Sequence, residues 1–303
     1  MKTPFFFLLL IFGFLQISCE KKNDVTYNPS FSSEQPIIKK KIIIFGVHPL
    51  HNPERLFEKF SPLMSYLESQ IPETKFELEA SKDYQSFEKK LEEKKFDIAL
   101  PNPYQTIKAV KNGYRVFAKM NDDDNFRGLI LVKKDGPIKK LEDLRHKIIT
   151  FPAKTALAAS MMPQYYLYQK GLDPKKDFTI KYVGSQESSI LSVFHNESAA
   201  GATWPGAWNL FKEDRPEIAD KMRELAHTDS LPSNSLIANS NLDPSTIEKI
   251  KKAILEISAN SEGAFVLKKL QLSKFVEADN KTYKKVEEFI QKFESSIERI
   301  ESR

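Results

Sequence analysis

Cysteine, glycine and the motifs of common catalytic sites are scarce in this sequence. Cys19 is the only cysteine among 303 residues, and there are ten glycines. The chain has no glycine-rich phosphate loop, no serine on a nucleophile elbow and no recognisable pair of catalytic carboxylates. We therefore expect no enzymatic activity and no cofactor.

The chain also lacks a strong excess of one charge. Lys and Arg together number 46 and Asp and Glu 41, which gives a formal net charge of +5. The two signs are interleaved throughout, so we expect no nucleic-acid-binding surface. The mild positive charge permits an anionic ligand or contact with a lipid surface.

The long apolar runs of a membrane protein are missing as well. The apolar run at residues 4–17 is too short for a membrane span, which takes about 20 residues. It follows one lysine and ends before Ser18-Cys19, an arrangement typical of a lipoprotein signal, although Gln16 stands where an aliphatic residue is usual. We predict a lipoprotein signal peptide at residues 1–18 and lipidation at Cys19; a secretory signal with an incidental cysteine is the alternative.

A polar segment rich in Ser, Asn and Lys follows this cysteine. Its composition predicts a flexible tether over residues 19–38, because such a segment cannot bury a core. The remaining chain of roughly 260 residues is long enough to bury a large core as one two-lobed unit or two domains.

Strand and helix patterns alternate over residues 42–104. The continuous apolar run at 42–46 predicts a buried parallel strand, and the alternating run at 76–80 predicts a second strand. Residues 96–100 predict a third strand, which Pro101 ends. Asn52-Pro53 predicts the start of a helix between them. Such a βαβαβ series predicts an open, doubly wound sheet whose ligand crevice lies at the carboxyl ends of the strands.

The stretch 147–171 predicts a strand, a turn at Pro152 and a helix that ends at Gly171. Pro163 lies inside the helical pattern, so the helix either begins near Ser160 or is kinked there. A helix that starts at the carboxyl end of a sheet presents free backbone N–H groups, which favour an anion.

Further strands and helices complete a second lobe and return to the first. We predict lobe 1 over residues 39–131 and 235–303, and lobe 2 over residues 132–234. The crossings between the lobes, which form the hinge, are expected near residues 130–134 and 233–238.

Several landmarks in this order resemble the phosphate, phosphite and phosphonate-binding family of ABC-transporter solute-binding proteins. They are Gly46-Val-His-Pro49, residues 60–67, Asp83-Tyr84, Phe96-Asp-Ile-Ala-Leu-Pro-Asn-Pro103, residues 138–145, residues 163–167, Gly184-Ser185 and Phe275-Val276 followed by Tyr283. The resemblance implies the α/β, two-lobed type II periplasmic-binding-protein fold, with a ligand held between the lobes.

The same resemblance implies an altered specificity. Family members hold the phosphonate oxygens with a hydroxyl-rich turn, whereas this chain has Ala156, Leu157 and Ala158 at those positions. Gln186 stands where a histidine is usual, and the acidic residues that would meet an amine fall near Gly206 and Asn234. If the alignment is off by one, Thr155 or Ser160 could supply a hydroxyl.

Other residues at strand ends are candidates because of their type and position. Tyr84 and Tyr104 could bond to or stack on a ligand, with packing at the lobe edge as the alternative. Trp204 would suit a less polar ligand, although a core role is the alternative. His48 and His51 lack a third metal ligand, so we expect no metal site. The expected ligand-binding residues are His48, Tyr84, Asn102, Tyr104, Thr155, Ala156, Ala158, Gln186, Trp204 and Asn234.

The function that we expect is extracytoplasmic solute binding. The protein would be a lipid-anchored monomer on the periplasmic face or the cell surface that delivers a small ligand to an ABC permease. The alternatives are a ligand-sensing lipoprotein, a surface lipoprotein that keeps the fold but binds other proteins, and a metal-dependent enzyme built on His48 and His51.

Overall fold

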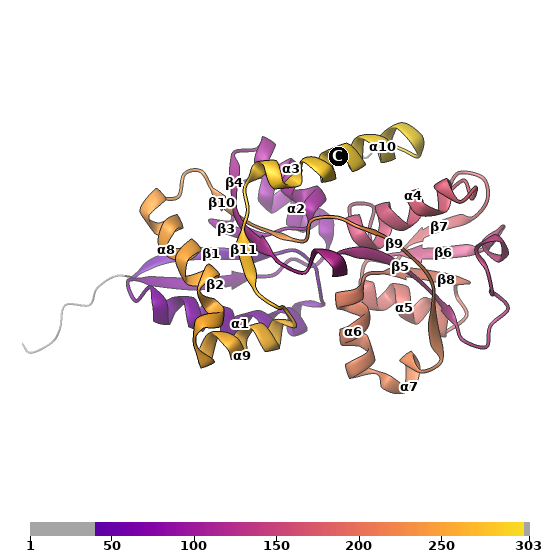
Figure 1. Ribbon diagram of the computed structural model, residues 1–303, viewed down its shortest axis with the longest axis horizontal. Helices are drawn as coiled ribbons and strands as arrows, with labels where there is room; N and C mark the ends of the chain where they lie inside the picture. Colours follow the sequence, from indigo (N-terminus) through magenta and orange to yellow (C-terminus); the bar gives the residue numbers. More distant parts are fainter. Residues whose placement is uncertain (1–39, 300–303) are drawn as a thin grey trace, which may run out of the picture. The chain divides into compact units, whose positions relative to one another are not determined.

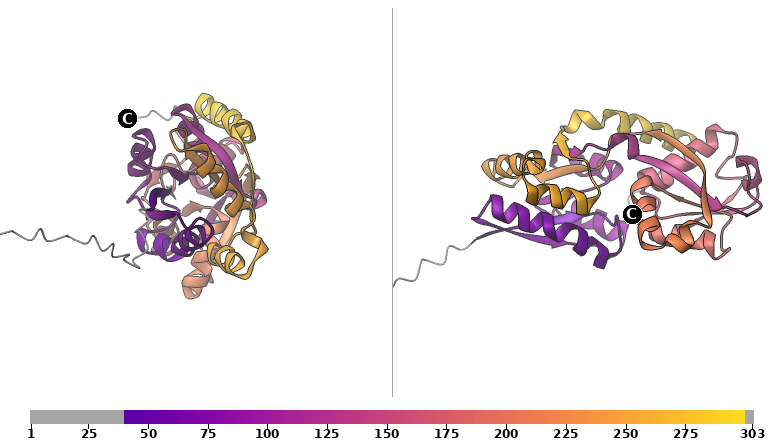
Figure 2. Two further views of the ribbon diagram at one scale, coloured as in Figure 1. Left: turned by 90° about the vertical axis from the view of Figure 1, so that its left-hand side faces the viewer. Right: turned by 60° about the horizontal axis from the view of Figure 1, so that its bottom comes forward.

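The computed structural model describes residues 40–299, which form two mixed α/β lobes (Figures 1 and 2). The predicted signal peptide, Cys19 and the predicted tether lie outside these residues. No helix within residues 40–299 is both long and apolar enough to cross a membrane.

Lobe 1 is built on a six-stranded sheet in the order β11-β4-β10-β3-β1-β2. Strand β1 is parallel to β2 and β3, whereas β10 runs antiparallel to β3 and β4, and β11 antiparallel to β4. The strands are β1 (Lys41–Val47), β2 (Thr74–Glu79), β3 (Ile98–Leu100), β4 (Tyr114–Met120), β10 (Ser235–Asn239) and β11 (Phe275–Glu277).

Both faces of this sheet are covered by helices. Along β3, Ile98 and Leu100 pack into one apolar cluster and Ala99 into another, so side chains alternate between two cores. This confirms the predicted doubly wound arrangement. The helices are α1 (Pro53–Gln70), α2 (Tyr84–Glu92), α3 (Pro103–Lys111), α8 (Pro244–Leu255), α9 (Ser261–Leu270) and α10 (Lys284–Ser296).

Lobe 2 repeats the scheme with a five-stranded sheet in the order β7-β6-β8-β5-β9. Strand β6 is parallel to β7 and β8, and β5 is antiparallel to β8 and β9. The strands are β5 (Arg127–Lys133), β6 (Ile148–Phe151), β7 (Thr179–Tyr182), β8 (Ala200–Thr203) and β9 (Met222–Ser230), and the helices are α4 (Met162–Gln169), α5 (Gln186–Phe194), α6 (Pro205–Asp214) and α7 (Pro216–Ala219).

The helix predicted after Pro152 is present but has two parts. A π-helical segment, η3 (Leu157–Met161), leads into α4, and Pro163 lies in the first turn of α4, where its missing N–H costs little. Gly128 of β5 packs so closely against η3 that a Cβ at this position would be 2.6 Å from the carbonyl oxygen of Ala158. Gly171 has a φ of 82° and follows α4 as predicted.

The first predicted crossing, near residues 130–134, is wrong. β5 pairs with β8 and β9, so the chain leaves lobe 1 earlier, between Met120 and Arg127. The predicted boundary at 131/132 consequently cuts through β5. The cause is β4, the last strand of lobe 1 before this crossing, which was not expected because Arg115 and Lys119 break its apolar pattern.

The second crossing spans residues 231–234, between β9 and β10. Strand β10, which returns to lobe 1, therefore begins at Ser235. Strand β9 was not predicted. Its exposed and half-buried residues alternate irregularly and include charged side chains at Arg223, Glu224 and Asp229.

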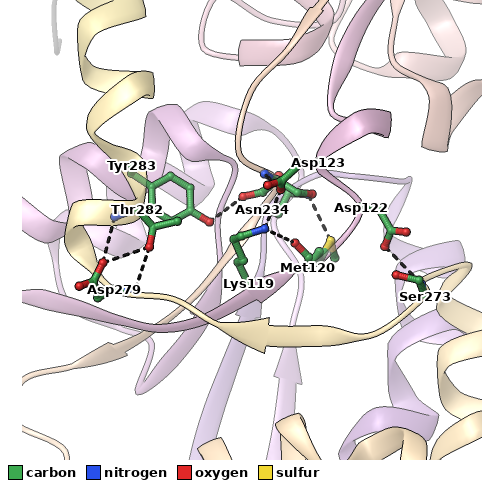
Figure 3. Close-up of polar contacts among 10 residues, drawn as sticks. Lys119, Met120, Asp122, Asp123, Asn234, Ser273, Asp279, Thr282 and Tyr283 are labelled. Atoms are coloured by element: carbon green, nitrogen blue, oxygen red, sulfur yellow. Dashed lines mark hydrogen bonds and ion pairs between the residues drawn. The ribbon is translucent and has the colours of Figure 1, made fainter.

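The two crossings are bonded to each other (Figure 3). A side-chain oxygen of Asp123, in the first crossing, accepts from the backbone N–H of Ser233, in the second, at 2.8 Å. The same oxygen lies 2.7 Å from the ammonium of Lys119. The hydroxyl of Tyr283 donates to the carbonyl oxygen of Ser233 at 2.6 Å. Both crossings are thus held to lobe 1 as one unit.

Candidate functional site

Six parallel strands end around one small cavity between the lobes. In lobe 1, β1 is followed by His48, β2 by Tyr84 and β3 by Asn102. In lobe 2, β6 is followed by the segment that starts at Ala156, β7 by Gln186 and β8 by Trp204. The crevice of a doubly wound sheet lies at these ends. The lining residues are His48, Leu50, Tyr84, Asn102, Phe126, Ala156, Leu157, Ala158, Ala159, Gln186, Trp204 and Asn234.

This cleft cavity is nearly closed. Its volume is about 20 Å³, which is enough for one water molecule. Phe126 and Asn234 reach it from the two crossings, so both lobes and the hinge contribute to its wall. A ligand of several heavy atoms therefore requires the lobes to move apart or side chains to change conformation.

Backbone donors enter the cavity wall from the start of the π-helical segment. The N–H groups of Ser160 and Met161 both donate to the carbonyl oxygen of Ala156, at 2.7 and 3.3 Å. Within residues 40–299, the N–H groups of Leu157, Ala158 and Ala159 have no acceptor. These free donors, together with the positive end of the helix dipole, can bind an anion.

His48 presents an acceptor at the cavity. Its Nδ1 lies 2.9 Å from the carbonyl oxygen of Leu100, and because a carbonyl only accepts, the proton is on Nδ1. The neutral ring therefore has its lone pair on Nε2. Burial lowers the pKa of His48 to about 4, an effect that the bond to Leu100 partly opposes. The ring is neutral at physiological pH.

A chain of hydrogen bonds crosses the cleft at Gln186. Its Nε2 donates to the hydroxyl of Tyr84 at 3.3 Å, and its Oε1 accepts from the hydroxyl of Thr203 at 2.9 Å. Burial raises the pKa of Tyr84 to about 12, so this hydroxyl keeps its proton. Gln186, which stands where a histidine is usual in the family, thus joins the two lobes directly.

Asn102 makes a second direct bond between the lobes. Its Nδ2 donates to the carbonyl oxygen of Thr155 at 2.9 Å, and its Oδ1 caps α3 through the N–H of Gln105. The hydroxyl of Thr155 donates to Glu88, which also accepts from Gln105 at 3.0 Å. Burial raises the pKa of Glu88, while these two bonds oppose the shift.

Two predicted residues face a different cavity. Tyr104 and Thr155 line a larger space of about 1150 Å³ on the α2–α3 side of the cleft, not the small cavity. Tyr84 borders both spaces. Ser160, the other residue considered for a hydroxyl, is fully buried and its Oγ has no partner, but it does not line the small cavity.

Asn234 is the least satisfied polar side chain in the cavity wall. It is 1% exposed, its Oδ1 is buried without a hydrogen-bond partner, and its Nδ2 lies 3.8 Å from the sulfur of Met120. A thioether is only a weak acceptor. The carboxamide of Asn234 is therefore available to a molecule in the cavity.

No lining side chain is an aspartate, glutamate, lysine or arginine. The apolar part of the wall includes Leu50, Phe126, Leu157 and Trp204, and the aromatic rings of Phe126 and Trp204 have centroids 6.2 Å apart. Burying a charge without a partner is costly, so this wall disfavours ligands of high charge.

The two histidines of the His-x-x-His spacing do not converge. His48 lines the small cavity, whereas His51 lines the two spaces near α6. Within residues 40–299, no three His, Cys, Asp or Glu side chains form a group that could hold a metal ion.

Some lining residues were missed by the sequence analysis. Leu50 lies in the loop after β1, and Ala159 is in the first turn of the predicted helix, so the strand-end rule could have found both. Phe126 could not be predicted as a lining residue, because the first crossing, in which it lies, was predicted several residues too late in the chain.

Two α/β lobes joined by two crossings, with a cavity at the carboxyl ends of their parallel strands, define a type II periplasmic binding protein. The family model described as "ABC transporter, phosphonate, periplasmic substrate-binding protein" matches residues 45–283. The chain belongs to this family of extracytoplasmic substrate-binding proteins of ABC transporters.

Two curated relatives share a modest identity with the chain. The phosphonates-binding periplasmic protein of Escherichia coli is 23% identical over 82% of this chain and 74% of its own length. A probable ABC transporter phosphite-binding protein of Prochlorococcus marinus is 23% identical over 57% of this chain and 63% of its own length.

Solved structures support the fold. The binding-protein component of an ABC phosphonate transporter from Pseudomonas aeruginosa superposes with a TM-score of 0.79, at 20% identity, over 85% of this chain and 88% of that chain. The Prochlorococcus marinus protein PhnD1, in complex with methylphosphonate, has a TM-score of 0.77 at 20% identity, over 83% and 98% of the two chains.

Proposed function

We propose that this protein is a lipid-anchored solute-binding protein that captures a small oxyanion in its cleft cavity and delivers it to an ABC permease. The observation that carries the proposal is the composition of the cavity wall. Strand ends from both lobes meet there, and the free N–H groups of Leu157, Ala158 and Ala159 lie in the wall. Groups from two lobes that contact one ligand couple its binding to closure.

The lipid anchor is supported by the sequence. The apolar run at residues 4–17 ends just before Cys19, the only cysteine of the chain. The polar residues 19–38 would link this anchor to the binding lobes, which would act as a monomer beside a permease in the same membrane.

The specificity is proposed to differ from that of the phosphonate-binding relatives. Ala156 and Ala158 line the cavity where the family places hydroxyls, and Gln186 is engaged with Tyr84 and Thr203. A hydrogen bond to a charged group contributes about 1.5–3 kcal/mol. The loss of several such bonds weakens phosphonate binding and leaves the apolar wall at Phe126 and Trp204 to favour a less polar substituent.

A second candidate function is favoured by one observation. Two direct hydrogen bonds join the lobes, one from Gln186 to Tyr84 and one from Asn102 to Thr155. A protein that is stable in this closed form could act as a ligand sensor or as a surface lipoprotein that binds other proteins.

A thermal-shift screen tests solute binding, which a transport protein or a ligand sensor requires and a protein-binding lipoprotein does not. The panel contains phosphate, phosphite, methylphosphonate, larger phosphonates, sulfonates and neutral metabolites, each tested at acidic and alkaline pH. A ligand at 100 times its Kd stabilises the native state by about 2.7 kcal/mol. That corresponds to a rise in Tm of several degrees for a domain of this size, at about 2–4 °C per kcal/mol. If no compound raises the Tm at either pH, the solute-binding proposal is wrong.

A further inference from the structure

The wall of the cleft cavity contains both hydrogen-bond donors and hydrogen-bond acceptors. The N–H groups of Leu157, Ala158 and Ala159 donate, and so can the hydroxyl of Tyr84, which accepts its bond from Gln186. His48 Nε2 accepts, because Nδ1 carries the ring proton. A ligand that satisfies this wall must both accept and donate hydrogen bonds.

Asn234 adds a second acceptor. Its Oδ1 is buried without a partner, and the side chain is 1% exposed. An unpaired buried acceptor destabilises the protein, so a ligand that donates to it binds more favourably than one that cannot. The amide group is placed so that Nδ2 faces the sulfur of Met120, which leaves Oδ1 for the ligand.

The charge of the wall limits the charge of the ligand. No Asp, Glu, Lys or Arg lines the cavity, and His48 is neutral. The positive end of the π-helical segment and α4 carries the equivalent of about half an elementary charge. It can balance one negative charge in part, but a second buried charge would remain without a partner.

From this distribution we infer that the cavity selects a singly charged oxyanion that still carries a proton, and that His48 and Asn234 are the residues that detect this proton. The inference rests on the proposed function, because it assigns the ligand class of the same cavity. Hydrogen phosphonates and related acids with one ionised and one protonated oxygen fit. Dianions carry too much charge, and sulfonates have no proton to donate.

Methylphosphonate and methanesulfonate form a matched pair for the test. They have the same shape, but a phosphonate retains one proton until near neutral pH, as a phosphate monoester does with its second pKa of about 6. Methanesulfonate is a monoanion without a proton throughout this range. Calorimetry at about pH 5.5 and about pH 8.5 therefore varies the ligand's proton and its charge.

We expect methylphosphonate to bind at least about tenfold more tightly at the lower pH, a difference of about 1.4 kcal/mol. Methanesulfonate should bind at least about tenfold more weakly than methylphosphonate at that pH, because one donor–acceptor pair is replaced by facing acceptors. Equal affinities of the two compounds, tighter binding at the higher pH, or no methylphosphonate binding at the lower pH would each overturn the inference.

The titration of protein groups near the cavity must be distinguished from the titration of the ligand. His48 and Tyr84 line the cavity with pKa values of about 4 and about 12, outside the tested range. Glu88 has a raised pKa and contacts the adjacent Thr155. Lys119 and Asp123 pair beside Asn234, and His51 lies next to Lys59, Arg55 and Asp214. Glu88→Gln should leave the pH dependence of methylphosphonate binding in place; its disappearance would assign that dependence to Glu88.

Two variants test the detecting residues. Asn234→Leu and His48→Phe each remove an acceptor, and the carbonyl oxygen of Leu100 keeps its bond from the backbone N–H of His48 at 3.1 Å. Each variant should reduce the preference for methylphosphonate over methanesulfonate to below about threefold, since one bond of about 1 kcal/mol or more is lost. Asn209→Leu, at an exposed position on α6, should retain the full preference. An unchanged preference in both acceptor variants would contradict the inference.

Failure of this inference is distinguishable from failure of the proposed function. If another panel compound binds while methylphosphonate does not bind at the lower pH, the ligand class is wrong and solute binding stands. If no compound binds at any pH, the proposed function itself is wrong.

Discussion

The side-chain amide of Gln186 donates a hydrogen bond across the cleft to the hydroxyl of Tyr84, at 3.3 Å. Gln186 begins α5 in lobe 2, whereas Tyr84 begins α2 in lobe 1. Both side chains are buried, at 7% and 4% exposure. The pair therefore joins the lobes at the place where a ligand would sit.

Removing this pair should favour an open form. In Gln186→Ala, Tyr84 and Thr203 both lose a partner, and each gains from access to water when the lobes separate. We expect the radius of gyration of the ligand-free protein, measured by small-angle X-ray scattering, to exceed that of the wild type. Gln85→Ala, at an exposed position one residue after Tyr84, is the control and should not change it. Equal scattering from Gln186→Ala and the wild type would show that the bond does not hold the cleft closed.

A ligand that replaces these cross-cleft bonds should close the variant again. The two crossings that form the hinge are held together by the bond between Asp123 and Ser233, so we expect the lobes to rotate about a single hinge. Adding a panel compound that binds should reduce the radius of gyration of Gln186→Ala toward the wild-type value. An open variant whose scattering does not respond to a saturating ligand would argue against closure on the ligand.

Restoring the family's side chains should restore phosphonate binding. The variant with Ala156→Ser, Ala158→Ser and Gln186→His adds two hydroxyls beside the free N–H groups and a ring that can carry charge. Each new bond to a charged group is worth about 1.5–3 kcal/mol, so affinity for methylphosphonate should rise by at least about tenfold. Ala153→Ser, outside the cavity wall, is the matched control. Calorimetry in which the triple variant and the wild type bind equally would show that these positions do not determine affinity.

The amount of fold that the sequence predicts depends on how regular each element is. The strands from Ile42 and Phe96 were found because most of their residues are apolar and their central positions are buried. β4 and β9 were missed because charged residues such as Lys119 and Arg223 interrupt the pattern. α3 begins with Asn102-Pro103, the same signal that was recognised at Asn52-Pro53, and its capping box with Gln105 could have been expected.

The residues of the site are also predictable only where the sequence pattern marks their position. His48, Tyr84, Asn102, Gln186 and Trp204 line the cavity because each stands just after a parallel strand, a position that the sequence reveals. Their partners are not revealed in this way. The bonds of Gln186 to Tyr84 and Thr203, and the redirection of Thr155 toward Glu88, depend on how the two lobes meet.

The buried neutral state of His48 should make stability depend on pH. Its pKa is lowered from 6.5 in the unfolded chain to about 4 in the folded protein, so the unfolded state binds more protons between these values. The free energy of unfolding should therefore fall as pH drops below about 6.5, by up to about 1.4 kcal/mol per pH unit, and level off below about 4.

Urea unfolding of the wild type and of His48→Phe at several pH values measures this contribution. The difference between the two proteins should grow as pH rises from about 4 to about 6.5 and stay constant above that range. Comparing the two proteins cancels the contribution of Glu88, and leaves from His51 only the part that comes from its repulsion by His48. A difference that does not vary with pH would mean that His48 is not buried in its neutral form.

Lipidation at Cys19 is tested by substitution. Cys19→Ala removes the only thiol, so the mature chain should leave the detergent phase in a phase-partition experiment or remain unprocessed, while its cleft binds ligand as before. Ser18→Gly, which keeps a small residue before the cysteine, should still be processed and enter the detergent phase. Retention of Cys19→Ala in the detergent phase, to the same extent as the wild type, would refute the anchor.

The central claim is that this cleft keeps the backbone donors of the family but has lost the side chains that make phosphonate binding tight. Calorimetry of methylphosphonate with the wild-type protein at about pH 7.5 tests it most directly. Three or four missing bonds at about 1.5–3 kcal/mol each predict a millimolar Kd or no measurable heat. A sub-micromolar Kd would contradict the claim, because the backbone N–H groups and the remaining polar side chains of the cavity would then be sufficient for tight binding.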